Sequence, residues 1–211
     1  MILGKAMPFD ETTDLVILQT VAAAVAESQA KAGKWIACRA GCSECCSVLF
    51  PITMQDAARL HRGWLAAPPA VRDDIHERAR HLWQHIEADF PGDPASGHFR
   101  ANDEWQEWFL TRHKGHPCPA VDPATGACRL YEHRPVACRL YGHLIQIGSE
   151  PQTICHYCFR GATETDIEQS RVHVPLESVE QHSLDPGETL ITRVLATAEW
   201  PPSNIPDASA P

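Results

Sequence analysis

The chain has 211 residues and a formal net charge of −9 at pH 7, with 18 Lys and Arg against 27 Asp and Glu. This acidic balance argues against a general binder of nucleic acids or anionic membranes, because phosphate contacts need clustered basic side chains. The length suits a single domain, which we expect over residues 1–200, followed by a disordered Pro/Ala/Ser-rich tail at 201–211.

The longest apolar stretch, Leu15 to Ala26, suits a core helix and is too short to cross a bilayer. The segment before it is acidic, unlike the start of a secretory signal. We therefore expect a cytoplasmic protein with no membrane partner and with reduced cysteines. Reducing conditions disfavour structural disulfides, so metal or redox chemistry is the usual reason for nine cysteines in such a chain.

Three long helices are predicted in the first half of the chain, over residues 12–32, 53–66 and 70–90. Thr53 is the expected N-cap of the second helix, and a proline- and glycine-rich stretch ends the third. The face of the first helix that we expect to be buried consists of Leu15, Leu18, Ala22, Val25 and Ala26.

Shorter elements are predicted further along the chain. A helix at 102–113 is expected to place Trp105 and Trp108 in the core. Between residues 114 and 160 we expect loops, a turn at 122–126 that joins two short strands, and a strand at 144–147. A last helix is predicted over 186–199. The fold class is therefore mostly α with a small cysteine-rich β/loop module, an irregular α+β metal-binding domain.

The spacing of the nine cysteines points to metal binding. Zinc and iron–sulfur clusters select thiolate ligands, and gaps of two or three residues let neighbouring thiolates face one centre. The alternatives are buried reduced cysteines, or a redox pair at the last two positions that lacks a thioredoxin-like strand–turn–helix setting. The expected metal ligands are Cys38, Cys42, Cys45, Cys46, Cys118, Cys128, Cys138, Cys155 and Cys158.

The first cysteine run has a local geometry that can be worked out. If it is helical, Cys38, Cys42 and Cys45 share a face, and Cys46 points roughly 100° away from Cys45. We therefore expect Cys46 to serve a second metal, another corner of a multinuclear centre, or the core. The first three also have radical-SAM spacing, but no βα alternation follows them. We expect this run to meet the later cysteines in space, because each half alone offers too few well-spaced ligands.

Two sets of charged or polar residues accompany the cysteines. Arg129, Arg134 and Arg139 lie near two of the later ones, where we expect them to balance thiolate charge. A further set on the third helix, Glu77, His81 and His85, has the spacing of a zinc triplet, but an ordinary solvated helix face is the stronger interpretation.

The string Cys-Arg-Ala-Gly-Cys-Ser-Glu-Cys-Cys at 38–46, then Cys-Pro at 118–119 and Gly-Ala-Cys-Arg-Leu-Tyr-Glu-His-Arg-Pro-Val-Ala-Cys-Arg-Leu-Tyr at 126–141, resembles bacterial cysteine-cluster proteins of the YkgJ type. The resemblance spans Trp35 to Cys158 and implies a zinc- or iron-chelating domain with eight cysteine ligands. Seven of these correspond to Cys38 through Cys138, and the eighth is Cys155 or Cys158. The first gap is three residues, where many relatives have two. The domain is also similar to the cysteine-rich part of flagellin lysine methylases, which implies an iron–sulfur centre.

The sequence therefore predicts a metal-binding protein whose cysteine cluster holds an iron–sulfur cluster or zinc, with iron favoured by the crowding at Cys45 and Cys46. One alternative is a metal-dependent enzyme or accessory subunit that modifies a protein or peptide, by analogy with the methylases. Another is a structural zinc module that binds a protein partner. No cosubstrate motif supports the enzyme, and no catalytic residue is assigned.

Overall fold

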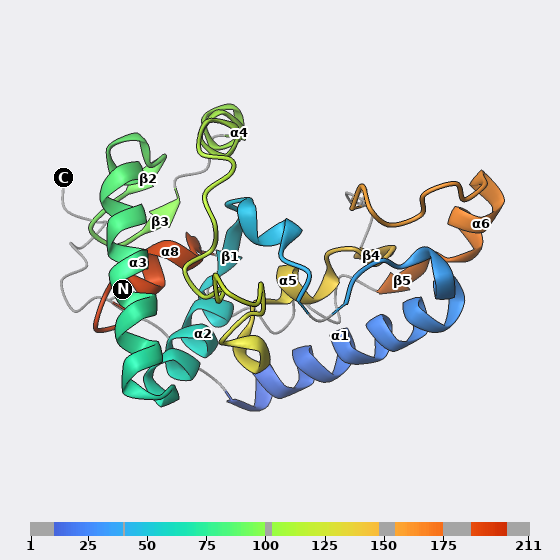
Figure 1. Ribbon diagram of the computed structural model, residues 1–211, viewed down its shortest axis with the longest axis horizontal. Helices are drawn as coiled ribbons and strands as arrows, with labels where there is room; N and C mark the ends of the chain where they lie inside the picture. The colour runs from blue at the N-terminus through green and yellow to red at the C-terminus, as the bar shows by residue number, and fades with distance from the viewer. Residues whose placement is uncertain (1–10, 40, 100–102, 148–154, 175–186, 202–211) are drawn as a thin grey trace, which may run out of the picture.

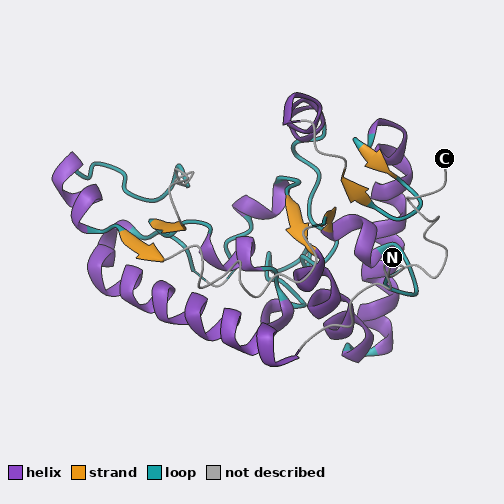
Figure 2. Cartoon of the chain, turned by 180° about the vertical axis from the view of Figure 1, so that it is seen from behind, coloured by secondary structure: helices purple, strands orange, loops and turns teal. Residues whose placement is uncertain are grey.

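A computed structural model shows an elongated molecule in which helix α1 (Glu11–Ala32) runs along one long edge (Figure 1). Most of the other helices and short strands gather toward the two ends of the molecule, with loops and a few short elements between them (Figure 2). No helix in the described part of the chain has an apolar run long enough to cross a membrane. The residues described are 11–39, 41–99, 103–147, 155–174 and 187–201.

One end of the molecule is built on α2 (Met54–Ala66) and α3 (Pro69–Ile86), against which α8 (Ile191–Leu195) packs. Strand β1 (Pro51–Thr53) leads into α2 and pairs antiparallel with β6 (Glu188–Leu190), which leads into α8. The Thr53 side chain accepts a hydrogen bond from the Asp56 amide at 3.1 Å, so it caps α2 as predicted. The buried core here consists of Ile52, Ala57, Leu60, Trp64, Ile75, Ala79, Ala120, Leu130, Val194 and Leu195.

The opposite end forms around α1. Helix α5 (Val136–Leu140), helix α6 (Glu164–Gln169) and strands β4 (Ile145–Ile147) and β5 (Val172–Val174) all contact it, and the two strands pair in parallel. The core at this end contains Ile17, Val21, Ala24, Leu140, Ile145, Val172 and Val174.

A third packing region covers the end of α3. Helix α4 (Asp103–Arg112) and the hairpin of β2 (Gly92–Asp93) and β3 (His98–Phe99) surround it. The buried side chains of this region are Leu49, Trp83, Ile86, Phe90, Phe109 and Leu190. Four single 3-10 turns complete the described elements: η1 (Gly33–Trp35), η2 (Glu44–Ser47), η3 (Glu87–Asp89) and η4 (Tyr131–His133).

A buried ionic network joins the two ends. Arg59 on α2 is about 4% exposed and forms ion pairs with Asp14 on α1 and Asp56 on α2. The Val136 amide at the start of α5 donates to both carboxylate oxygens of Asp56 at 3.1 Å. A buried guanidinium with these partners has its charge balanced, whereas an unpaired one would be strongly destabilising.

The mostly α fold class is confirmed, and so are the three long helices, the short helix near 102–113 and the strand at 145–147. The predicted turn at 122–126 joins the ends of one antiparallel bridge, Val121 to Cys128, and not two strands. The last helix was placed too early: residues 188–190 pair with β1 as strand β6, and the helix covers only 191–195. The tail at 202–211 lies outside the described residues.

The predicted face of α1 is wrong at three of its five positions. Leu15 is 56% exposed, and Ala22 and Ala26 are exposed as well, whereas Leu18 and Val25 are half-buried and Val25 packs against the core. Because α1 is apolar nearly all round, its sequence pattern does not indicate which face is buried. The ion pair of Asp14 with Arg59 agrees with the observed orientation of the helix. The buried positions are Asp14, Ile17, Val21, Ala24, Ser28 and Ala32.

The placement of the α4 tryptophans in the core is wrong as well. Trp105 is 55% exposed and Trp108 is 46% exposed. Phe109 is the residue of α4 that is fully buried, with its ring 5.9 Å from that of Phe90. A ten-residue helix that packs through one edge buries only that edge, and Phe109 occupies it.

Candidate metal centre

Four thiols from three separate segments line one small cavity. The cavity has a volume of about 30 Å³, close to the share of one water molecule in the liquid. Most of the remaining wall is apolar and comes from the segment before β1 and from the β6–α8 junction. The lining thiols are those of Cys45, Cys46, Cys118 and Cys138.

Backbone hydrogen bonds bring these segments together. The Cys118 amide donates to the Cys46 carbonyl at 2.6 Å, so residues 72 positions apart are neighbours. Turn η2 carries Cys45 and Cys46, while Cys138 lies in α5. Cys128 belongs to the same set, because it packs with Cys118 against the α2–α3 core. We refer to these five cysteines as the inner group.

The expected divergence of Cys45 and Cys46 is wrong, since both line the same cavity. That expectation assumed a helix or strand at this point, whereas the chain makes a single 3-10 turn. Gly41 precedes it with a φ of +83°, a left-handed conformation that favours glycine. The first run is therefore not one continuous α-helix, and Cys38 and Cys42 do not share a helix face with Cys45.

The inner thiols differ sharply in acidity. Burial raises the pKa of Cys118 to about 12, and burial likewise raises the pKa of Cys138. A hydrogen bond between the Cys45 and Cys46 side chains lowers the pKa of Cys45 to about 7 and raises that of Cys46. Near neutral pH, Cys45 is therefore the thiol of this cavity that ionises most readily, beside the neutral thiols of Cys46, Cys118 and Cys138. A cation in the cavity would offset the desolvation that keeps the others protonated.

The other four cysteines form an outer group on the α1 side of the molecule, made up of Cys38, Cys42, Cys155 and Cys158. The Ala37 amide donates to Cys158 Sγ at 3.4 Å. A Cβ at Gly142 would lie 3.5 Å from Cys158 Sγ and 3.9 Å from Cys38 Sγ, so these two sulfurs flank one spot. Cys155 and Cys158 are buried in a core with Leu144 and Phe159, whereas Cys38 and Cys42 are exposed.

The two groups are electrostatic neighbours. Although Cys38 is exposed as a residue, partial desolvation of its thiol raises its pKa first, followed by Cys42 and Cys45, so Cys45 of the inner group acts on a thiol of the outer group. The sulfurs are not yet at ligand spacing: among the described residues, no three of them lie within 4.8 Å of one another. Since zinc–sulfur bonds are about 2.3 Å long, binding requires side-chain rotations that draw the thiols inward.

Arg134 is the arginine that best fits charge compensation. Its positive charge lowers the pKa of Cys45, and it acts in the same direction on Cys38, Cys128 and Cys138. Its guanidinium lies 4.0 Å above the centre of the Tyr131 ring.

The other two predicted arginines have different principal contacts. Arg129 forms an ion pair with Asp74 at 2.6 Å and acts only secondarily on Cys128. Arg139 donates to the backbone carbonyls of Glu132 and Arg134.

Sequence reasoning missed Arg78, which lies on α3. Its guanidinium donates to the carbonyls of Pro119 at 2.9 Å, of Val121 and, more weakly, of Cys118 at 3.5 Å. These bonds hold the loop that carries Cys118 against the helix. A polar helix face without further context gives no signal for this role. The set of Glu77, His81 and His85 does not form a metal site, and His85 instead approaches two other histidines.

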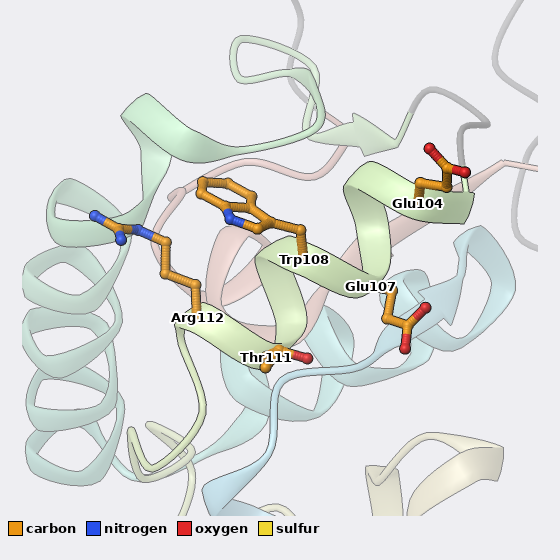
Figure 3. Close-up of a pocket in the computed structure, with 5 residues that line it drawn as sticks. All are labelled: Glu104, Glu107, Trp108, Thr111 and Arg112. Atoms are coloured by element: carbon orange, nitrogen blue, oxygen red, sulfur yellow. The ribbon is translucent and has the colours of Figure 1, made fainter.

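A broad surface hollow lies elsewhere, on α4 (Figure 3). It is lined by Glu104, Glu107, Trp108, Thr111 and Arg112, whose side chains all come from one helix. In the close-up they point in different directions, and no cysteine is among them. The hollow therefore lacks the convergent groups of a binding site.

Residues 37–159 match the family model CxxCxxCC, described as a "Putative zinc- or iron-chelating domain". The match covers more than half of the chain and includes all nine cysteines, so the chain belongs to this family of zinc- or iron-chelating domains. No curated protein and no solved structure matches the chain. The finer resemblance to YkgJ-type proteins and to lysine methylases stays a prediction from the sequence.

Proposed function

We propose that this protein binds two metal ions through thiolates, one in the inner group and one in the outer group, with zinc as the metal of the inner site. The inner ion takes four ligands from the five inner cysteines. The outer ion takes Cys38, Cys42, Cys155 and Cys158. Nine thiols thus give two four-thiolate sites and one spare, close to the eight-ligand pattern that the family resemblance implies.

The observation that carries this proposal is the cavity lined by four thiols. Its donor set is the one found in closed structural zinc sites, where four thiolates surround the ion and no position is left for water. Its apolar walls exclude water and strengthen the attraction between a cation and its thiolates. A lone thiolate on Cys45 supplies a starting point for metal entry.

The small volume supports a single ion over an iron–sulfur cluster, because a cube of irons and sulfides would need the walls to move outward. A cluster that joins the two groups is the second candidate. The coupling of Cys45 to both Cys38 and Cys118 favours it, since thiols of the two groups act on one another. The small cavity volume nevertheless favours zinc at the inner site, against the preference for iron drawn from sequence crowding.

The metals would have a structural effect. Cys118 and Cys128 pack on the core of α2 and α3, while Cys155 and Cys158 pack beside α1. The first cysteine run contributes thiols to both the inner and the outer group. Ions held by this run and by the later cysteines would fasten the two ends of the molecule to each other, and part of the binding free energy would become folding free energy.

Anaerobic purification with metal analysis, followed by Co²⁺ titration of the metal-free protein, tests the proposal. Cobalt bound to thiolate gives an intense near-ultraviolet charge-transfer band that cobalt bound to imidazole lacks. We expect a colourless zinc protein and a cobalt–thiolate band that stops growing at two Co²⁺ per chain. A brown protein with stoichiometric acid-labile sulfide would select the iron–sulfur cluster, and absence of the band would reject thiolate binding altogether.

A further inference from the structure

Three histidines outside the thiol groups converge beside the end of α3. His85 lies in the last turn of α3, His113 directly follows α4, and His116 lies in the loop that leads to Cys118. One possible ligand atom from each of them lies within 4.8 Å of the other two. In the described residues, this is the one set of three such side chains that reaches this spacing.

The three rings lie close together around one point. The ring centroids of His85 and His116 are 5.0 Å apart with planes at 63°, and those of His85 and His113 are 6.0 Å apart with planes at 87°. Those of His113 and His116 are 6.4 Å apart with planes at 34°. Together with the spacing of the ligand atoms, these distances place all three imidazoles within reach of one shared ion.

Surrounding contacts hold the ring of His113. His113 is buried, and its Nε2 lies 3.1 Å from Asp89 Oδ2, which also accepts a hydrogen bond from Arg112 at 2.9 Å. When Nε2 donates to Asp89, Nδ1 carries the lone pair that a metal ion needs. A carboxylate on the other nitrogen of a ligating histidine orients the ring and makes it more basic.

The loop that carries His116 is also fixed. The Gly115 amide donates to the Ser47 carbonyl at 2.8 Å, and the Cys118 amide donates to the Cys46 carbonyl. His116 is therefore mounted on the same segment that positions the inner group, and its side chain contributes to the wall of the thiol-lined cavity. The histidines lie beside that cavity, and two of the three do not line it.

We propose that His85, His113 and His116 form a second kind of metal site in this protein, a three-histidine site for Zn²⁺. Three neutral imidazoles are a set that zinc binds readily, and a water molecule completes its four-coordinate shell. The exposed position of His85 leaves that fourth side open to solvent. The site does not depend on the thiolate function, because none of its ligands is a cysteine.

Zinc titration of the full-length, reduced protein against a competing chelator tests this site. His85 is exposed near the end of α3, so His85→Ala should preserve the fold. We expect His85→Ala to bind one Zn²⁺ per chain fewer than the wild type. His81→Ala is the matched control, because His81 is exposed one turn earlier on the same helix, and it should bind as much zinc as the wild type. Equal zinc binding by the His85→Ala and His81→Ala proteins would overturn the proposal.

The cobalt–thiolate band of the His85→Ala protein separates the two kinds of site, because His85 does not line the thiol cavity. We expect this variant to lose its one Zn²⁺ and to keep the cobalt–thiolate band at full strength. A weaker band in this variant would join the histidines to the thiolate centre and overturn the separate three-histidine site. Asp89→Asn should keep the ligands but weaken zinc binding at this site by roughly 10–100-fold, the effect expected on losing a partner that orients a ligand. Unchanged affinity in that variant would remove Asp89 from the site.

Discussion

The inner and outer thiol groups differ in how their positions are held. The inner cysteines rest on the core of α2, α3 and α8 and are tied to it by the Arg78 bonds and by the pairing of Cys118 with Cys46. Two of the outer cysteines, Cys38 and Cys42, lie exposed on a segment without regular structure. Packing thus holds the inner cysteines in place before a metal binds. In the outer group, metal binding also has to order the segment that carries Cys38 and Cys42.

This difference has an energetic meaning. Ordering a flexible segment costs conformational entropy, which lowers the affinity of any ligand that requires the ordering. Two sites built from the same kind of ligand should therefore differ in affinity, with the inner site the stronger. The experiments below test that contrast.

Removal of one inner thiolate should have the largest effect. Cys118→Ser takes a half-buried ligand from the cavity, and we expect the inner metal to be lost or bound at least about 100-fold more weakly, while the outer site keeps its metal. Competition titration with a zinc chelator measures the affinities of both sites. Cys38→Ser should lose the outer metal and keep the inner one. Ser43→Ala, a change in the same run, should alter the affinity of neither site. Loss of both metals in either cysteine variant would show that the groups form one centre.

Chelation should loosen the outer segments more than the inner ones. Residues 36–39 and 41–42 have no regular structure and are half-buried or exposed, whereas residues 118–130 are held by Arg78 and by packing on α3. Hydrogen exchange with and without metal is the measurement. We expect the protection lost on chelation to be greatest in the first of these two regions and small in α2 and α3. A uniform loss would indicate that the inner loop also needs metal to fold.

Binding at the inner site should release protons. At pH 8 the thiols of Cys46, Cys118 and Cys138 are neutral because their pKa values are raised, while Cys45 is mostly thiolate. Their conversion to ligands releases about three protons, so affinity falls as pH falls, by about tenfold per pH unit for each proton. Calorimetry in two buffers of different ionisation enthalpy counts the protons. Release of fewer than two would contradict the protonation assigned to these thiols.

Loss of the Arg134 charge should produce a smaller effect that reaches both groups. Arg134→Gln removes the cation that lowers the pKa of Cys45 and also favours the thiolates of Cys38, Cys128 and Cys138. We expect metal affinity to fall by about tenfold at each site, within the range for residues around a ligand shell. Arg134→Lys keeps the positive charge and should therefore retain most of the metal affinity of the wild type. Equal losses in the two variants would show that the contact with Tyr131, and not the charge, matters.

The sequence was informative where one local pattern dominates. The cap at Thr53 and the periodic apolar residues of α3 predicted those helices, and cysteine spacing predicted the chemistry of the family. It could not divide the cysteines into groups, because the division depends on long-range contacts such as that of Cys118 with Cys46. Nor could it find the three histidines, since His85 and His113 meet only when α4 packs beside the end of α3.

The buried Arg59 has a consequence for how α1 docks. A helix that is apolar on most sides gains similar hydrophobic free energy in several rotations, so burial alone leaves its orientation degenerate. Asp14 breaks that degeneracy, because any other rotation leaves the buried guanidinium on α2 with Asp56 as its remaining partner and without the ion pair to α1. The ion pair therefore selects one docked orientation of α1. The strands and cysteine-bearing segments that pack on α1 take their positions from that orientation, and so depend on the charge of Asp14 in the first turn of the helix.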